Sequence, residues 1–351
     1  MKQFGAHSTK DMSDTHTRIF VPFRSVLKKK KEKAQTMGLK RRREEDEYGE
    51  EKDKNRLAKK YPHAKDSSIL FDEEPHIYSV DWDEDPKEEG KGKRVFSSDG
   101  IISVTSFIHR DFEHFDADKV IAKMQASKKW PKSKYFGLTP DEIKALWDAN
   151  SLQACTAGSV MHLQIEWMYN GSPPEEPCSI EYKQFLEYHH KIISLKWLPF
   201  RTEWMLRSPE KYLLTGTIDM LYLPPEGPER TSVAPDGRRI LHLHMADWKR
   251  SLKITLVNPW STGKDLCSDL PDTNFYHYSL QLNTYKYMLE NWYHNMLVDG
   301  IVYDDIQIDS MAIVAMHPET RTEYLELAID DYQPLIARMF ERRAKEIIKN
   351  F

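Results

Sequence analysis

The sequence "LHLHMADWKRSL", from Leu241 to Leu252, places two charged side chains on an otherwise apolar face of a predicted strand. Side chains alternate between the two faces of a strand, so Asp247 and Lys249 share a face with apolar residues such as Met245. An ion in an apolar setting is strongly unfavourable unless a partner or a metal compensates its charge. The stretch therefore predicts either a salt bridge or a functional site at the end of a buried strand.

The composition indicates a globular protein. The chain has 351 residues, of which 40% are hydrophobic, enough for one large core or two modest ones. Its longest uncharged apolar runs, such as Ser310 to Met316, are far shorter than the roughly 20 residues that a membrane span requires. The N-terminus also lacks the apolar region of a secretory signal. We therefore expect an intracellular protein that does not interact with membranes.

The cysteine count and the net charge exclude little. Three cysteines are widely spaced and odd in number, which favours a reducing compartment, and they are one short of the four thiolates that an iron–sulfur cluster usually takes: Cys155, Cys178 and Cys267. We therefore expect no iron–sulfur cluster. The net charge of -4 does not decide for or against nucleic-acid binding, because the local distribution of charge matters more than the total.

The first 66 residues are polar and carry blocks of like charge. Such a segment buries too little apolar surface to offset its ordering entropy, so we predict a disordered tail over residues 1–66 and a folded domain over residues 67–351. The basic cluster Lys40 to Arg43 suits a nuclear address or a phosphate-attracting patch, and the alternative is a tail that only adds solubility.

The sequence of the folded part predicts strands and helices in alternation. Its first two β-rich runs flank the glycine-containing "PKEEGKGKRVF" and predict a hairpin between "HIYSV" and "GIISVTSFI". Thr139, Pro140 and Glu142 form a capping box that starts a helix, and a further helix is expected from Ser151 to Asn170. Later strands are expected in "PFRTEWMLRS", "YLLTGTIDMLYLPP", "IDSMAIVAMHP" and "TEYLELAI", with helices in "FYHYSLQLNTYKYMLENWYHNML" and "DDYQPLIARMFERRAKEIIKN". The pattern predicts an α/β fold.

Acidic and basic side chains on these elements are candidates for chemistry. Asp219 lies in "GTIDMLYL", a run that is apolar on both faces, where a lone acid is either functional or a structural ion-pair partner. Asp247 and Lys249 can together hold a divalent metal and place a positive charge beside one reacting phosphate. The alternative for this pair is a salt bridge.

Two further candidate groups lie on predicted helices. His162 shares a helix face with Glu166. Gln281 and Tyr285 share a face of a later helix. For each group the alternative is ordinary packing or surface exposure on an amphipathic helix.

In their order along the chain, these motifs resemble the RecB-like branch of the PD-(D/E)xK nuclease superfamily. The motifs are a helix with histidine, an acid-bearing strand before "GTID", the strand "ADWK" and the helix "QLNTY". The resemblance covers roughly Phe71 to Met288, where "HIYSV" and "SVTSFI" look like the entry to mitochondrial and phage exonucleases. The chain also looks like nucleases of giant DNA viruses. The resemblance implies a restriction-endonuclease-like mixed central sheet flanked by helices, with an N-terminal β-hairpin and a helical insertion.

The resemblance also implies roles for the candidate residues. It makes Mg²⁺ or Mn²⁺ the cofactor, held by His162, Asp219, Asp247 and the backbone carbonyl of Trp248. Lys249 would orient or activate the attacking water and stabilise charge on the phosphate. These hard cations prefer oxygen ligands with at most a histidine or so, whereas no zinc-binding spacing appears.

Three more residues match elements of the family. Glu203 matches an acid that many members use beside a second metal, while Gln281 and Tyr285 match the Q-x-x-x-Y element that contacts the substrate backbone. The sequence departs from the family in two respects: "GTID" replaces a literal Pro-Asp, and the cysteine cluster of some relatives is absent.

The implied function is metal-dependent hydrolysis of DNA. We expect an exonuclease that acts on single-stranded ends in DNA repair, recombination or replication, in the nucleus or in a viral replication compartment. The alternatives are a non-catalytic nucleic-acid-binding or assembly module that keeps the fold, and an RNA-processing nuclease.

The segment "SKKWPKSKYFG", Ser127 to Gly137, is a candidate contact for single-stranded DNA. Its lysines suit phosphate neutralisation and its aromatic side chains suit base stacking. The candidates are Trp130, Lys132, Lys134 and Tyr135. The alternative is that the aromatic side chains pack beneath the following helix while the lysines point to water.

Overall fold

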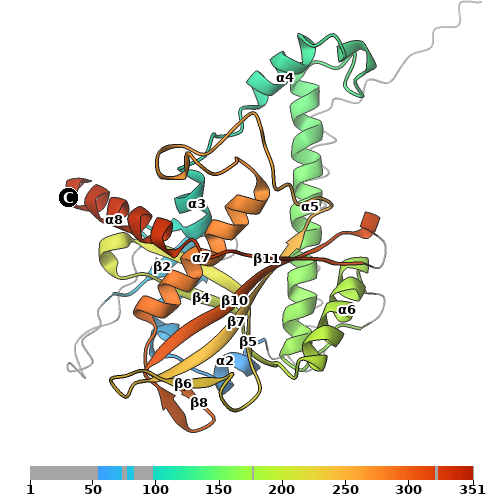
Figure 1. The fold of residues 1–351 in the computed structure, drawn as a ribbon. Helices are drawn as coiled ribbons and strands as arrows, with labels where there is room; N and C mark the ends of the chain where they lie inside the picture. Colours follow the sequence, from blue (N-terminus) through green and yellow to red (C-terminus); the bar gives the residue numbers. More distant parts are fainter. Residues whose placement is uncertain (1–53, 73–76, 83–97, 176–177, 321–322, 351) are drawn as a thin grey trace, which may run out of the picture. The chain divides into compact units, whose positions relative to one another are not determined.

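The computed structural model describes residues 54–72, 77–82, 98–175, 178–320 and 323–350, all of which belong to one compact unit, Asp53–Phe351 (Figure 1). Most of the predicted tail, including the cluster Lys40 to Arg43, lies outside these residues. The glycine-containing turn predicted over residues 86–96 lies outside them as well.

A mixed central sheet with helices on both faces forms the core, as predicted. Within the described residues it has seven strands in the order β11-β10-β7-β5-β3, with β4 paired to β5 and β6 paired to β7. β10 runs parallel to β7, and β3 runs parallel to β5, whereas the other neighbours are antiparallel. The strands are β3 Ile102–Ser103, β4 Leu198–Arg207, β5 Leu214–Leu223, β6 Thr231–Val233, β7 Arg239–Arg250, β10 Asp305–Met316 and β11 Leu325–Ala328.

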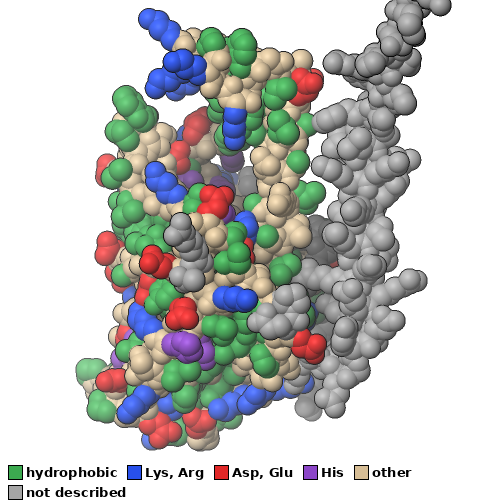
Figure 2. All heavy atoms as spheres, turned by 90° about the vertical axis from the view of Figure 1, so that its right-hand side faces the viewer, with side chains coloured by type: hydrophobic (Ala, Val, Ile, Leu, Met, Phe, Trp, Pro, Cys, Tyr) green, Lys and Arg blue, Asp and Glu red, His purple; other side chains and the backbone are tan. Residues whose placement is uncertain are grey.

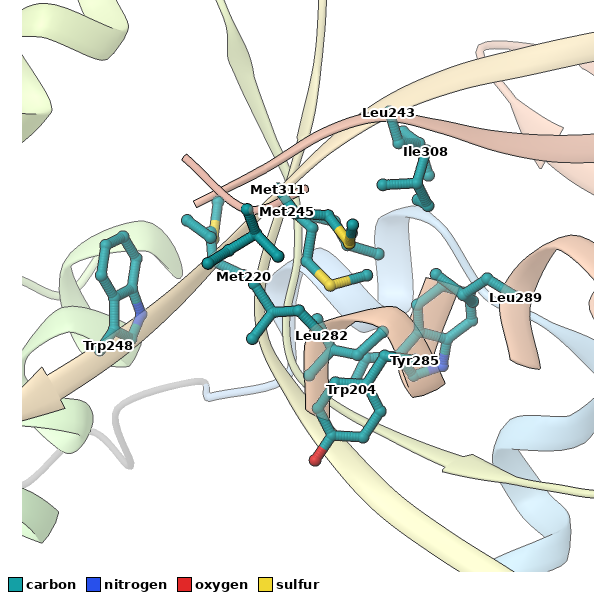
Figure 3. Close-up of a cluster of buried hydrophobic side chains, with 14 of the residues drawn as sticks. Trp204, Met220, Leu243, Met245, Trp248, Leu282, Tyr285, Leu289, Ile308 and Met311 are labelled. Carbon is teal, nitrogen blue, oxygen red and sulfur yellow. The ribbon is translucent and has the colours of Figure 1, made fainter. Parts of the chain in front are cut away.

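The alternation in β7 sends its side chains to two different helical layers. Met245 packs with Leu282 and Tyr285 of α7, Asn274–Trp292, in the cluster of Figure 3. Trp248 lies apart from these side chains in Figure 3 and places its ring edge-on to Phe185 of α6, Ile180–Ser194. Helices therefore cover both faces of β7, and only its first residue, Arg239, is exposed.

The longest helix, α5, spans Pro140–Tyr169 as one continuous element. Thr139 and Glu142 form the predicted capping box, and Gly171 has a φ of +87° just beyond the helix end. The prediction of two helices was wrong, because neither glycine nor proline interrupts residues 141–157. The N-terminal half of α5 extends past the sheet and meets α4, Ala117–Gln125, at its upper end in Figure 1.

The predicted N-terminal hairpin is placed wrongly. A hairpin does form, but it joins β1, Ile69–Asp72, to β2, Ile77–Val80. The second β-rich run gives only the two residues of β3 and then α3, Val104–His109, which Ser103 starts by accepting a hydrogen bond from the backbone N–H of Ser106. The buried Val104, Phe107 and Ile108 have helical spacing, and their packing outweighs the β-propensity of the run.

Order begins before the predicted boundary at Asp66. The helix α2, Arg56–Lys60, and the 3-10 turn Ala64–Ser68 precede the sheet. Tyr61 is 1% exposed, and Asp66 accepts hydrogen bonds from Arg201 Nη1 at 2.9 Å and Trp204 Nε1 at 2.8 Å. Residues 54–66 are thus packed against the sheet, although their composition is that of a solvated tail.

The remaining elements connect or cover the sheet. The helix α7 ends at Trp292, earlier than predicted, because Met296–Val298 and Ile301–Tyr303 pair as the hairpin β8–β9. The final helix, α8 Gln333–Asn350, packs through Phe340 against Phe107. Short 3-10 turns occur at Trp130–Lys132, Glu210–Tyr212, Asp265–Cys267 and Pro318–Thr320. Among the described residues, no helix combines the length and the apolar character needed to cross a membrane.

Candidate functional site

The candidate site lies where β5 and β7 separate. The two strands pair at Met220 with Ala246, but the backbone ladder ends there. Beyond it, the Asp219 side chain links the two strands in place of a backbone hydrogen bond, because its Oδ2 accepts the backbone N–H of Trp248 at 2.7 Å. Asp219, the acid within the apolar run of β5, therefore holds the two strands together where they separate. This point is here called the fork.

Asp247 and Lys249, two residues apart on the same face of β7, form an ion pair. Lys249 Nζ lies 2.6 Å from Asp247 Oδ2, and it also lies 4.8 Å from the ring centroid of Tyr278 on α7. Apart from this ion pair, neither carboxylate oxygen of Asp247 has a hydrogen-bond partner within the described part of the chain, although the residue is only 2% exposed. Burial raises the pKa of Asp247 to about 6.

Lys249 remains a cation in this setting. Burial alone would lower the pKa of its ammonium group. The negative charges of Asp247 and Asp219 outweigh that effect and hold the pKa above its usual value. Lys249 therefore presents hydrogen-bond donors and a positive charge to the fork.

His162 reaches the fork from α5. Its Nε2 donates to the backbone carbonyl oxygen of Trp248 at 3.1 Å, and its Nδ1 lies 3.2 Å from Glu203 Oε1 and 3.8 Å from Asp219 Oδ2. Burial disfavours a charged imidazole, but Asp219 and Glu203 together outweigh it and raise the pKa of His162 to about 9. Each ring nitrogen thus faces an acceptor oxygen, and binding of a metal through one of them would require its deprotonation.

Glu203 is brought to the fork by a distortion of β4. Its φ is +44°, a left-handed value that few residues other than glycine adopt in a strand, and β4 has a register shift at Pro199 and Arg201. Such a conformation costs on the order of 1 to 3 kcal/mol and persists only where surrounding structure enforces it. The distortion turns the Glu203 carboxylate toward His162 on the neighbouring helix.

The side chains of His162, Glu203 and Asp219 can supply three ligand atoms to one metal ion. These atoms lie within 4.8 Å of one another. The donors are one nitrogen and carboxylate oxygens, and the Trp248 carbonyl lies beside them, so the set fits a hard divalent cation better than a thiolate-binding one. Buried Asp247 pairs with Lys249 through Oδ2, and its Oδ1, which has no hydrogen-bond partner among the described residues, fits the same reading.

Both residues predicted on α7, Gln281 and Tyr285, face the fork. Gln281 Nε2 donates to Tyr285 Oη at 3.2 Å, and Tyr285 is buried against Gly216 of β5. A Cβ on Gly216 would lie 2.6 Å from Tyr285 Cε1, so this strand position admits only glycine without movement of the ring. Burial raises the pKa of Tyr285, and the nearby Asp219 and Asp247 add to the effect.

Two tyrosines at the fork were missed by sequence reasoning. The Tyr78 hydroxyl of β2 forms a hydrogen bond with Thr217 Oγ1 at 3.0 Å. Its pKa is raised chiefly by burial and to a smaller extent by the negative charges of Glu203 and Asp219. Tyr278 lies over Lys249. Tyr278 could have been found, because it precedes Gln281 and Tyr285 by three and seven residues on one helix face. No comparable signal identifies Tyr78.

The predicted single-strand contacts do not join this cluster. Trp130, Lys132, Lys134 and Tyr135 lie before the start of α5, about 30 Å from His162 along the helix at its usual rise per residue. Lys132 and Lys134 are exposed, and Figure 2 shows Lys and Arg side chains beside hydrophobic ones at this upper end of the molecule. Tyr135 is held in place, since its hydroxyl accepts a hydrogen bond from Trp147 Nε1 at 2.9 Å.

No family model matches this chain, and no match was found among the curated proteins.

Proposed function

We propose that this chain is a metal-dependent deoxyribonuclease of the RecB-like branch of the PD-(D/E)xK superfamily, with a restriction-endonuclease-like core. The observation that carries the proposal is the fork itself. His162, Glu203 and Asp219 converge there from α5, β4 and β5, beside the Asp247 and Lys249 pair of β7. A structural ion pair alone would not account for five ionisable side chains gathered from four elements at one break in the sheet.

The proposed cofactor is Mg²⁺ or Mn²⁺. His162, Glu203, Asp219, Asp247 and the carbonyl of Trp248 would hold it, and when bound it would supply the positive charge that neutralises the phosphate oxygens during hydrolysis. Asp219 has a second task, because its bond to the Trp248 N–H fixes the position of the Trp248 carbonyl. Lys249 would donate hydrogen bonds to the attacking water or to the phosphate and stabilise the charge that develops there.

The proposed substrate is single-stranded DNA with free ends, and exonuclease action is favoured over endonuclease action by the family resemblance. The exposed lysines of Ser127–Gly137 and its partly exposed aromatic side chains support a nucleic-acid substrate, because they lie at the end of the helix that carries His162. Gln281 and Tyr285 would support the substrate backbone at the fork.

The rival proposals are a non-catalytic nucleic-acid-binding module and an RNA-processing nuclease. A module without catalysis has no need of two buried carboxylates, Asp219 and Asp247, held close together at one break in the sheet. No side chain that the structure describes at the fork discriminates deoxyribose from ribose, so both kinds of strand belong in the test.

The test is cleavage of end-labelled linear and covalently closed single-stranded DNA, and of end-labelled RNA, with Mg²⁺ or Mn²⁺. We expect cleavage of linear DNA that falls by several orders of magnitude in Asp219→Asn, Asp247→Asn and Lys249→Ala. Lys191→Ala is the matched control, because Lys191 is a lysine paired with Glu326 on the surface. If Lys249→Ala cleaves like the wild type while remaining folded, the mechanism is wrong.

A further inference from the structure

A loop beside the fork holds a tryptophan almost wholly in solvent. The segment Ser251–Thr273, here called the Trp260 loop, joins the end of β7 to the start of α7 (Figure 1). Trp260 is 91% exposed, the highest value among the exposed large hydrophobic side chains of the described residues. Three more exposed apolar side chains lie on the same loop: Leu252, Leu256 and Val257. Such clustering marks an interaction surface more often than chance exposure does.

Hydrogen bonds and close packing brace the loop around this side chain. Asn258 Oδ1 accepts the backbone N–H of Trp260 at 3.1 Å, and Asn258 Nδ2 donates to the carbonyl of Asp272 at 2.8 Å. Thr262 and Pro271 form a β-bridge across the loop. Gly263 packs so closely on Cys267 that a Cβ would lie 2.5 Å from its carbonyl oxygen. The indole is therefore displayed by a fixed backbone, which lowers the entropy lost on binding.

Both ends of the Trp260 loop adjoin the proposed site. The loop leaves β7 two residues after Lys249. Its base is closed by Asn274, which accepts the backbone N–H of Thr255 at 2.8 Å and donates to the carbonyl of Lys253 at 3.0 Å. One helical turn further along α7, Tyr278 lies over Lys249. The loop base is thus attached directly to the two elements that position Lys249.

We propose that the Trp260 loop stacks on an unpaired nucleobase of the strand whose phosphate enters the fork. This inference rests on the proposed nuclease function and assigns the loop as a binding element of that same site. A flat aromatic ring on a loop whose base adjoins the proposed phosphate-processing site suits base stacking, which any base can provide with its π-face. Lys253, exposed at the loop base, adds a cation for the adjacent phosphate.

The test measures binding without cleavage. Fluorescence anisotropy of labelled single-stranded DNA and RNA is recorded in EDTA with the full-length protein and with Trp260→Ala and Trp260→Phe. We expect Trp260→Ala to weaken binding by about 5- to 150-fold, the range for loss of one stacked base, and Trp260→Phe to retain most of the affinity. Ile348→Ala, at a 75% exposed apolar side chain on α8, is the matched control and should bind like the wild type.

An oligonucleotide with abasic sites supplies the decisive comparison. If Trp260 stacks on a base, abasic DNA should bind the wild type more weakly and should abolish the difference between wild type and Trp260→Ala. Equal affinity of Trp260→Ala and wild type for ordinary DNA would overturn the inference. So would a loss of affinity on going from wild type to Trp260→Ala that is as large for abasic DNA as for ordinary DNA. A wild type that binds no oligonucleotide would overturn it too.

The outcomes separate this inference from the proposed function. Binding that depends on Trp260, without cleavage by any metal-loaded sample, would reject the nuclease and retain the stacking loop. Cleavage together with binding that does not depend on Trp260 would retain the nuclease and reject the stacking loop. Self-association that sedimentation detects in the wild type and that Trp260→Ala abolishes, with unchanged DNA affinity, would assign the loop to a protein interface and overturn the inference.

Discussion

His162 Nε2 lies 3.1 Å from the backbone carbonyl oxygen of Trp248, so a helix and a strand that are 86 residues apart in sequence meet at one candidate ligand atom. The same imidazole contacts Glu203 through its other nitrogen. His162 therefore joins the acid of β4 to the fork between β5 and β7. Removing His162 would take a hydrogen-bond partner from both Glu203 and the Trp248 carbonyl.

The first prediction concerns metal affinity. His162→Ala should weaken Mn²⁺ binding by at least about tenfold, because it removes one ligand and the contact that holds Glu203. Titration calorimetry at constant pH measures the change. His190→Ala, at an exposed histidine of α6, is the matched control and should bind Mn²⁺ like the wild type. Unchanged affinity in His162→Ala would return His162 to an ordinary packing role.

The second prediction concerns the start of the folded domain. A chain beginning at Lys54 should keep its stability and activity, since charge-blocked residues cannot build the site. A chain beginning at Ser67, the boundary predicted from sequence, should lose at least about 3 kcal/mol of stability. It would lack buried Tyr61 and leave two donors, Arg201 and Trp204, without the carboxylate of Asp66. Urea denaturation of both chains measures the difference, and equal midpoints would contradict it.

The third prediction compares two glycines. Gly216→Ala should destabilise the protein by about 1 to 3 kcal/mol, because the new Cβ would lie 2.6 Å from Tyr285 Cε1 in a closed site. Gly158→Ala in α5 is the matched control, where the nearest atom is 3.9 Å away. There a gain of about 0.5 to 1 kcal/mol is expected, because alanine favours the helix interior. Thermal unfolding resolves the opposite signs, and a tolerated Gly216→Ala would mean that Tyr285 moves freely.

The parity of β7 is the part of the site that the sequence could predict. Alternation alone places Asp247 and Lys249 on the apolar face, and the structure has them there as an ion pair at the end of a buried strand. The capping box of α5 and the strand around Asp219 were predictable for the same reason, because each depends on neighbours in sequence. The mixed sheet then follows from the order of strands and helices.

Other features depend on contacts that sequence patterns do not encode. The φ of +44° at Glu203 has no signal in the sequence, because glutamate is not a residue type that favours positive φ. The run "IISVTSFI" has strand propensity, yet packing of Phe107 makes it a helix. In contrast, the turn at Asp299 and Gly300 between β8 and β9 was predictable, since Asp-Gly with two positive φ values is a strong hairpin signal.

The fourth prediction concerns stability and pH. The backbone N–H of Lys65 donates to His63 Nδ1 at 3.1 Å, and His63 Nε2 donates to the carbonyl of His294 at 3.1 Å. This pattern needs the neutral ring, and burial lowers the pKa of His63 below its usual value. A lowered pKa in the folded state means that the contribution is present above the unfolded value, about 6.5, and is lost as pH falls through the folded value.

The variant that isolates this effect is His63→Asn. An asparagine can still accept the Lys65 N–H as a cap but does not titrate. Between pH 7.5 and pH 5, the wild type should therefore lose more unfolding free energy than His63→Asn, as measured by urea denaturation at each pH. His190→Asn, at an exposed histidine, should follow the wild type. Parallel curves for wild type and His63→Asn would show that His63 does not govern this loss.

The last prediction concerns the segment Ser127–Gly137 at the far end of α5. Trp130 and Phe136 lie with ring centroids 6.1 Å apart, while Lys134 Nζ lies 5.0 Å over the Tyr135 ring. Aromatic side chains that alternate with exposed lysines can stack on bases while the lysines neutralise phosphates. If the segment contacts single-stranded DNA, the two kinds of residue must respond differently to salt.

Trp130→Ala should weaken single-strand binding with little change in its salt dependence, because stacking releases no counterions. Lys132→Ala combined with Lys134→Ala should instead flatten the dependence of log affinity on log salt by somewhat more than one unit, at about 0.7 per lost phosphate contact. Lys345→Ala with Lys349→Ala, two exposed lysines of α8, is the matched control. Isotherms at several salt concentrations that match the wild type for both variants would assign the segment to packing around Trp147, where Tyr135 is already bonded.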